Sequence, residues 1–195
     1  LLNTAVRMYL LIAVPAVAGV WAVSYQAAYA LFAPEYVEGH VVMFWVALGM
    51  MFLGLTEYSI KNWELHANTS AIFKRSMIGG VVNVGLNLVL VKLLDSYFIA
   101  SVTTFLGFFV YFLLAVFGTR KHLIWHIKAR SLFNILLSAA VMAGVIKLME
   151  SVLPEGKLYL ALFIFCGIIV YGLMLTLTGE VRDELSIISA KLIRK

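Results

Sequence analysis

Six long apolar stretches follow one another along this chain, and short segments that carry the charged residues separate them. A helix needs roughly 17 to 25 mostly apolar residues to cross a bilayer core of about 30 Å. Four stretches reach this length without any Asp, Glu, Lys or Arg, and the other two do so by including one terminal lysine each, whose aliphatic stem can extend toward the headgroups. We therefore predict an all-α membrane protein with six transmembrane helices. Their predicted ranges are 8–34, 39–60, 76–94, 96–119, 131–149 and 158–179.

The lysines and arginines collect in alternate connections between these helices. Twelve of the 15 lie on the side shared by the two ends of the chain, and only Lys92, Lys147 and Lys157 lie on the other side. Cytoplasmic loops of membrane proteins carry an excess of positive charge. The alternation therefore predicts an even number of spans, with both ends of this segment on the cytoplasmic side of the inner membrane.

The composition supports a lipid environment. Hydrophobic residues make up 63% of the chain and charged residues 13%, whereas soluble domains have roughly half and a quarter. The net charge of +5 is spread over helix ends, which fits anionic lipid headgroups and not a nucleic-acid surface. Two basic segments are predicted to lie along the cytoplasmic surface as amphipathic helices: the tail at 180–195, and a shorter segment before the fifth span. In this shorter segment the expected contacts to anionic lipids are Arg120, Lys121, Lys128 and Arg130.

Two asparagines lie inside the third apolar stretch. Asn83 and Asn87 are four residues apart, so they share one face of a helix whose other residues are almost all aliphatic. An amide exposed to lipid is costly, so this face is expected to point into the bundle. There the pair can hydrogen-bond to another helix, or it can line a polar passage.

Other polar positions are weaker candidates. Pro15 is expected to bend the first helix, either as a simple kink or as a hinge, and Gln26 lies further along the same helix. Glu57 could couple transport to protons only if it is desolvated, and Glu57, Lys61 and Glu64, at spacings of four and three, can otherwise pair along one continuing helix. His122 and His126 have the spacing of a metal pair, but no carboxylate or cysteine pattern accompanies them. We therefore expect no metal and no cofactor.

Three segments resemble the carboxy-terminal part of the polysaccharide and lipid-linked oligosaccharide flippases, in the superfamily of multidrug/oligosaccharide/polysaccharide exporters. They are RMYLLIAVPAVAGVWAVSYQAAYALFAPEYVEG, VVNVGLNLVLV and TGEVRDELSIISAKLIRK. The resemblance implies that the chain is a piece of a longer protein, the last six of fourteen helices, forming one lobe of a flippase-like (MATE-like) bundle. It also implies a place in the transport path for Pro15, Asn83 and Asn87, and we add Gln26 as a candidate.

The function that the resemblance implies is transport and not catalysis. A polyprenyl-(pyro)phosphate-linked oligosaccharide would move from the inner to the outer leaflet, for cell-surface polysaccharide synthesis, as two lobes rock around a central cavity. The expected partners are membrane lipids, the lipid-linked oligosaccharide and the amino-terminal lobe of the same protein. Three alternatives stay open: a cation-coupled exporter of the same superfamily that uses Glu57, a membrane polymerase or ligase of glycan assembly, and a purely scaffolding subunit. The second is disfavoured because the outer connections are too short to build a catalytic pocket.

Overall fold

The computed structural model describes residues 1–119, 125–154 and 156–180. Within these ranges it is all-helical, and six helical segments are long and apolar enough to cross a membrane. The fold is therefore that of a multi-pass membrane protein with the six predicted spans. The helices are α1 (Leu2–Leu31), α2 (His40–Ser59), α3 (Lys61–Leu65), α4 (Thr69–Leu86), α5 (Lys92–Leu94), α6 (Tyr97–Thr119), α7 (Ala129–Val152) and α8 (Lys157–Leu177), with a 3-10 helix η1 (Pro34–Gly39) and a π-helix η2 (Asn87–Val91).

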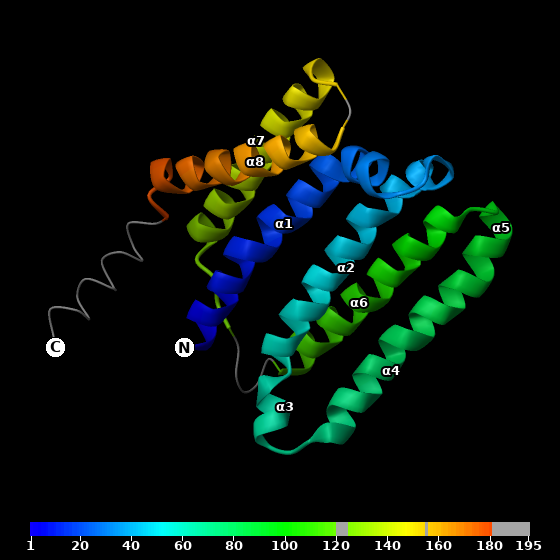
Figure 1. Cartoon of the computed structure of the whole chain (residues 1–195). Coiled ribbons are helices and arrows are strands. Elements are labelled where there is room, and N and C mark those ends of the chain that lie inside the picture. Colours follow the sequence, from blue (N-terminus) through cyan, green and yellow to red (C-terminus); the bar gives the residue numbers. More distant parts are fainter. Residues whose placement is uncertain (120–124, 155, 181–195) are drawn as a thin grey trace, which may run out of the picture.

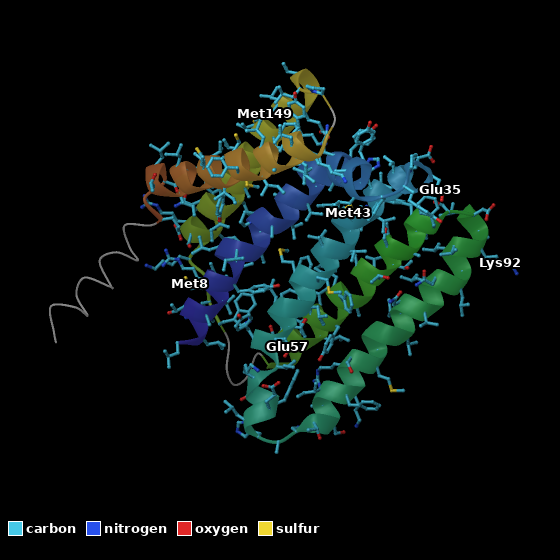
Figure 2. The ribbon with its side chains drawn as sticks, viewed as in Figure 1. Met8, Glu35, Met43, Glu57, Lys92 and Met149 are labelled. Atoms are coloured by element: carbon cyan, nitrogen blue, oxygen red, sulfur yellow. The ribbon has the colours of Figure 1, made fainter. Side chains whose placement is uncertain are left out.

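The spans form a row with a helix pair at one side of it (Figure 1). α4 packs on α6, α6 on α2, and α2 on α1, while α7 and α8 pack against each other and against α1. Successive spans run in opposite directions, so the ends of the helices alternate between two levels. Figure 2 shows Met149 and Glu35 at one level, and Met8 and Glu57 at the other. α1 is thus the helix that joins the row to the α7–α8 pair.

Apolar side chains fill the contacts between neighbouring helices. One buried cluster joins α1, α2 and α7, and a second joins α1, α7 and α8 around Phe163, which is fully buried. Between α2 and α6 the contact is aromatic, with the ring centroids of Phe52 and Phe109 4.9 Å apart. The outer surfaces of the spans are also apolar, for example at Ile12, Leu88 and Ile168. This is expected where lipid tails, and not water, surround the helices.

Several helix ends differ from the predicted ranges. α1 begins at Leu2 and not at residue 8, and Arg7, which lies in the added first turns, is paired with the buried Glu180. α4 begins at Thr69 and not at residue 76, because the side chain of Asn68 accepts a hydrogen bond from the backbone N–H of Ala71 and caps the helix. The predicted ranges were drawn from runs of apolar residues, so they left out the charged and polar first turns of these two helices.

The predicted surface helix before the fifth span is wrong where it can be checked. Residues 125–128 are not helical, and α7 begins only at Ala129. Trp125 turns inward, where its indole N–H donates to the hydroxyl of Ser59 at 3.1 Å and its ring stacks on Phe112. These contacts compete with a helix that would keep the tryptophan at the lipid surface.

The predicted lipid contacts stay predictions. Lys128 and Arg130 are exposed, as a headgroup contact requires. Arg120, Lys121 and His122, and the tail beyond Glu180, lie outside the described residues.

Candidate functional site

The two asparagines of the third span form a polar cluster with a threonine of the fourth. Asn87 donates from its side-chain amide to the amide oxygen of Asn83 at 2.6 Å. The hydroxyl of Thr103, on α6, donates to the amide oxygen of Asn87 at 2.8 Å and is fully buried. The asparagines themselves are half-buried. The pair therefore faces the neighbouring helix, and both asparagines keep part of their surface accessible.

Two glycines allow this cluster to form. A Cβ atom on Gly107 of α6 would lie 2.8 Å from the Cβ of Asn83, and one on Gly79 of α4 would lie 2.8 Å from the carbonyl oxygen of Gly107. The backbones of α4 and α6 are in close contact here, which brings short polar side chains within hydrogen-bonding distance. Asn87 of this cluster is also the first residue of the π-helix η2, a feature often found at functional sites.

Gln26 does not join the asparagines. It is almost completely buried near the other end of α1, and its side-chain oxygen accepts a hydrogen bond from the backbone N–H of Gly156 at 3.4 Å. Gly156 lies in the connection between α7 and α8. The structure therefore places Gln26 beside a separate polar cavity and not on one polar face with Asn83 and Asn87.

Pro15 lies inside α1, which continues as a helix on both sides of it. A proline has no N–H, so the carbonyl four residues earlier, that of Leu11, loses its helical hydrogen-bond donor. In this structure the hydroxyl of Tyr171 on α8 donates to the Leu11 oxygen at 2.9 Å. The proline thus creates a free acceptor in an apolar region, and α8 supplies the donor.

Replacing Tyr171 by Phe is expected to lower the free energy of unfolding by about 1 kcal/mol, because the Leu11 carbonyl is left without a partner in an apolar setting. In a Pro15→Ala background the same change should cost close to nothing, since the new backbone N–H at position 15 can donate to Leu11. Unfolding titrations of the four proteins in mixed micelles would measure this double-mutant cycle. Equal costs in both backgrounds would show that Tyr171 does not serve the proline.

A second buried polar cluster ties the ends of three helices together. The guanidinium of Arg7 on α1 lies 2.9 Å from the carboxylate of Glu180, which follows α8 and is 5% exposed. Ser131 and Asn134, in the first turns of α7, also donate to this carboxylate, Asn134 at 3.2 Å. Burial by itself would raise the pKa of Glu180, but these hydrogen bonds and the nearby Arg7 outweigh it and lower the pKa below the usual 4.5. The carboxylate is therefore held in its charged form.

Glu57 lies at the same end of the molecule and is exposed (Figure 2). Of the expected pairing among Glu57, Lys61 and Glu64, the structure shows the contact of Lys61 with Glu64 at 2.6 Å. The three do not share one continuing helix, because the helix breaks at Ile60 between α2 and α3. The condition for a coupling role, a desolvated carboxylate, is not met here. Within the described ranges no three His, Cys, Asp or Glu side chains are grouped closely enough to hold a metal ion.

The sequence reading missed Thr103, Tyr171 and Glu180. Thr103 stands in an apolar run and resembles any threonine that bonds to its own helix. For Tyr171 the signal was Pro15, because a proline inside a helix leaves the carbonyl four residues earlier without a donor, and a tyrosine on another span can supply one. For Glu180 the signal was its position, the first acidic residue after the last span, opposite the one arginine that precedes the first span.

Comparison with known proteins gives a similar fold among solved structures but no related sequence. No family model and no curated protein matches the sequence. Among solved structures, the fold is similar to that of the lipid II flippase MurJ in an inward closed conformation, with a TM-score of 0.78 and 17% sequence identity. The match covers 94% of this chain and 39% of that chain, so this sequence spans well under half the length of the flippase. The likeness confirms the predicted six-helix, flippase-like architecture.

Proposed function

We propose that this chain is the carboxy-terminal part of a flippase that moves a polyprenyl-(pyro)phosphate-linked oligosaccharide across the inner membrane for cell-surface polysaccharide synthesis. The observation that carries the proposal is the likeness of nearly the whole chain to a protein named as a lipid II flippase. The match covers 39% of that flippase, and the rest of it leaves room for an amino-terminal lobe that this sequence does not contain. Both ends of the present segment would face the cytoplasm, in agreement with its distribution of lysine and arginine.

The polar cluster on α4 and α6 suits the chemistry of such a substrate. A sugar pyrophosphate needs polar partners throughout its passage, whereas the prenyl chain can stay in lipid. Asn83, Asn87 and Thr103 offer amide and hydroxyl groups on otherwise apolar helices, and the asparagines are half-buried and not sealed off. We place this cluster on the transport path. Alternating access would open it to each side in turn, with the Pro15 region of α1 as the bending point.

The alternatives have less support. A cation-coupled exporter needs a desolvated carboxylate, and Glu57 is exposed. A glycan polymerase or ligase would need acid, base or cationic groups on a sizeable outer domain, whereas α1 and α2 are joined by η1, and α5 and α6 by a short turn. Transport of a lipid-linked sugar remains the function that the architecture favours.

The test is leaflet transfer of a fluorescent lipid-linked oligosaccharide by the full-length protein in proteoliposomes. Replacing both Asn83 and Asn87 by Leu is expected to slow transfer about tenfold or more, as if one to two charge-assisted hydrogen bonds were lost. A matched pair controls for packing. Thr103→Val removes a hydroxyl that reaches Asn87, and Thr104→Val removes its neighbour, whose hydrogen bond within the described residues goes to the Ala100 carbonyl of its own helix.

Thr103→Val should therefore slow transfer several-fold and Thr104→Val hardly at all. If the double leucine variant transfers substrate at the wild-type rate, the cluster does not belong to the path. If the wild-type protein transfers no lipid-linked sugar but exports small molecules along an ion gradient, the exporter is the better description.

A further inference from the structure

A polar cavity of about 740 Å³ opens at the end of the bundle that carries Met149 and Glu35 in Figure 2. It lies between the last turns of α1, the start of α2 and the end of α7. The residues that line it are Tyr25, Gln26, Tyr29, His40, Lys147, Glu150, Leu153 and Pro154. It is distinct from the Asn83–Asn87 cluster, which none of these residues contacts through a hydrogen bond in the described structure.

One wall of this cavity holds a carboxylate with an unused acceptor. Glu150 accepts a hydrogen bond from the ammonium of Lys147 at 2.6 Å through Oε2. Its other oxygen, Oε1, is buried and has no hydrogen-bond partner among the described residues. Leaving a buried acceptor unpaired is costly, and the few such groups in folded proteins call for an explanation. A ligand that donates a hydrogen bond would satisfy this carboxylate once the side chain turns Oε1, which faces protein atoms in this structure, toward the cavity.

The surroundings restrict what that ligand can be. An anion is disfavoured because the charge of Lys147 is already matched by Glu150, and the free oxygen would repel it. A compact cation is disfavoured because Lys147 stands beside the same carboxylate, with its ammonium also 5.6 Å from the centre of the Trp21 ring. A neutral group with several hydroxyls meets no such objection, since it donates to Glu150 and accepts from Lys147.

The rim of the cavity is aromatic. Tyr29 is 48% exposed, and Tyr25 lies edge-on to His40, with ring centroids 5.4 Å apart. Aromatic walls with a few convergent polar groups are the usual makeup of small-molecule sites, and a volume of about 300–1,000 Å³ is typical of them. The apolar faces of a pyranose ring can lie on a tyrosine, while its hydroxyls reach the carboxylate, the ammonium and an amide.

We propose that this cavity is a sugar-binding site on the side of the protein opposite its amino end, with Glu150 as the acceptor for sugar hydroxyls and Tyr29 as the stacking platform. It is separate from the path proposed above. It rests on the proposed function only for the source of the sugar, which would be the glycan of a lipid-linked substrate after transfer. A site here would hold the delivered glycan away from the bundle and oppose its return.

Binding of soluble neutral sugars to the full-length protein tests the proposal. The probes are maltotriose and chitotriose, followed by saturation-transfer difference NMR with the protein in phosphatidylcholine nanodiscs, whose headgroups carry no hydrogen-bond donor. We expect at least one trisaccharide to bind with a Kd in the millimolar range or below, and Glu150→Gln to weaken this binding about tenfold or more. Tyr29→Ala, on the exposed rim, should weaken it several-fold without any effect on folding.

The chain supplies a matched control. Lys61 and Glu64 form the same three-residue-spaced pair at the same 2.6 Å, at the opposite end of the bundle and in an exposed setting. Glu64→Gln should leave sugar binding unchanged. The proposal is overturned if Glu150→Gln binds as the wild type does, if Glu64→Gln weakens binding equally, or if neither sugar binds at about 20 mM. It is also overturned if tetramethylammonium displaces the sugar, because the site would then be one for cations.

The leaflet-transfer assay on the same preparations separates the two proposals. Transfer without any sugar binding would remove this site and leave the flippase function intact. Sugar binding that depends on Glu150, in a protein that transfers no lipid-linked sugar, would leave the site as a glycan-binding surface of a protein with another function.

Discussion

Replacing Arg7 by Met is expected to lower the free energy of unfolding by about 2–4 kcal/mol, because the carboxylate of Glu180 would stay buried without its cation. In the intact protein the guanidinium lies 2.9 Å from that carboxylate, and the side chains are only 19% and 6% exposed. Arg7 also donates to the Glu180 backbone carbonyl at 3.1 Å. The measurement is an unfolding titration of the purified protein in mixed micelles.

Two further variants separate the ion pair from general damage. Lys61→Met breaks an exposed pair, 43% and 40% accessible, and should cost no more than about 0.5 kcal/mol. Adding Glu180→Gln to Arg7→Met should recover part of the loss, since no buried charge is then left alone. If Lys61→Met and Arg7→Met are equally costly, the Glu180 cluster is not a stabilising feature.

The free energy of unfolding should also depend on pH through Glu180, and it should fall as the solution is acidified. Because the pKa of Glu180 is lowered below 4.5 in the folded protein, its contribution is fully present above about pH 4.5 and is lost as the pH falls through the folded value. Acidification in that window should destabilise the wild type more than Arg7→Met, in which part of the pKa shift is gone.

α1 is held to the α7–α8 pair at three levels along its length. Arg7 meets Glu180 near one end, Tyr171 bonds to the carbonyl freed by Pro15, and Gln26 accepts from Gly156 near the other end. The middle contact falls at the point where the helix is weakest. A bend of α1 at Pro15 therefore requires α8 to follow it or to release it, so the α7–α8 pair is placed to control any hinge motion there.

The spans could be predicted from sequence because lipid imposes a simple rule. A helix that crosses the bilayer satisfies its own backbone and must be apolar over about 20 residues, so hydropathy alone finds it. The shared face of Asn83 and Asn87 followed from helical spacing, and the structure joins them by a hydrogen bond. Local periodicity was enough for both results.

The partners across the bundle could not be predicted in the same way. Arg7 and Glu180 are 173 residues apart, and Tyr171 is 160 residues from Leu11, so no spacing rule connects them. The polar cavity lined by Tyr29 and Glu150 was also missed, since its lining comes from three helices. The surface helix before α7 was predicted from basic and apolar residues that fit an amphipathic pattern, but Trp125 found a better partner inside the bundle.

Replacing Gly79 by Leu is expected to lower the free energy of unfolding by about 3 kcal/mol or to prevent folding, because α4 and α6 would be forced apart. Even a Cβ atom at this position would lie 2.8 Å from the backbone oxygen of Gly107 and 3.0 Å from the Cβ of Tyr111. Backbone atoms cannot move aside as a flexible side chain can. The displaced helices should also separate Thr103 from Asn87 and slow lipid transfer.

The adjacent glycine provides the control for this substitution. Gly80 has the same helix propensity and flanking sequence, but a Cβ there would meet nothing within 4 Å. Gly80→Leu should therefore change the stability of the protein by no more than about 0.5 kcal/mol, or raise it slightly through better helix propensity. Unfolding titrations and transfer rates of the two variants measure the difference. If both variants are equally damaged, the crossing of α4 with α6 is not the contact that limits stability.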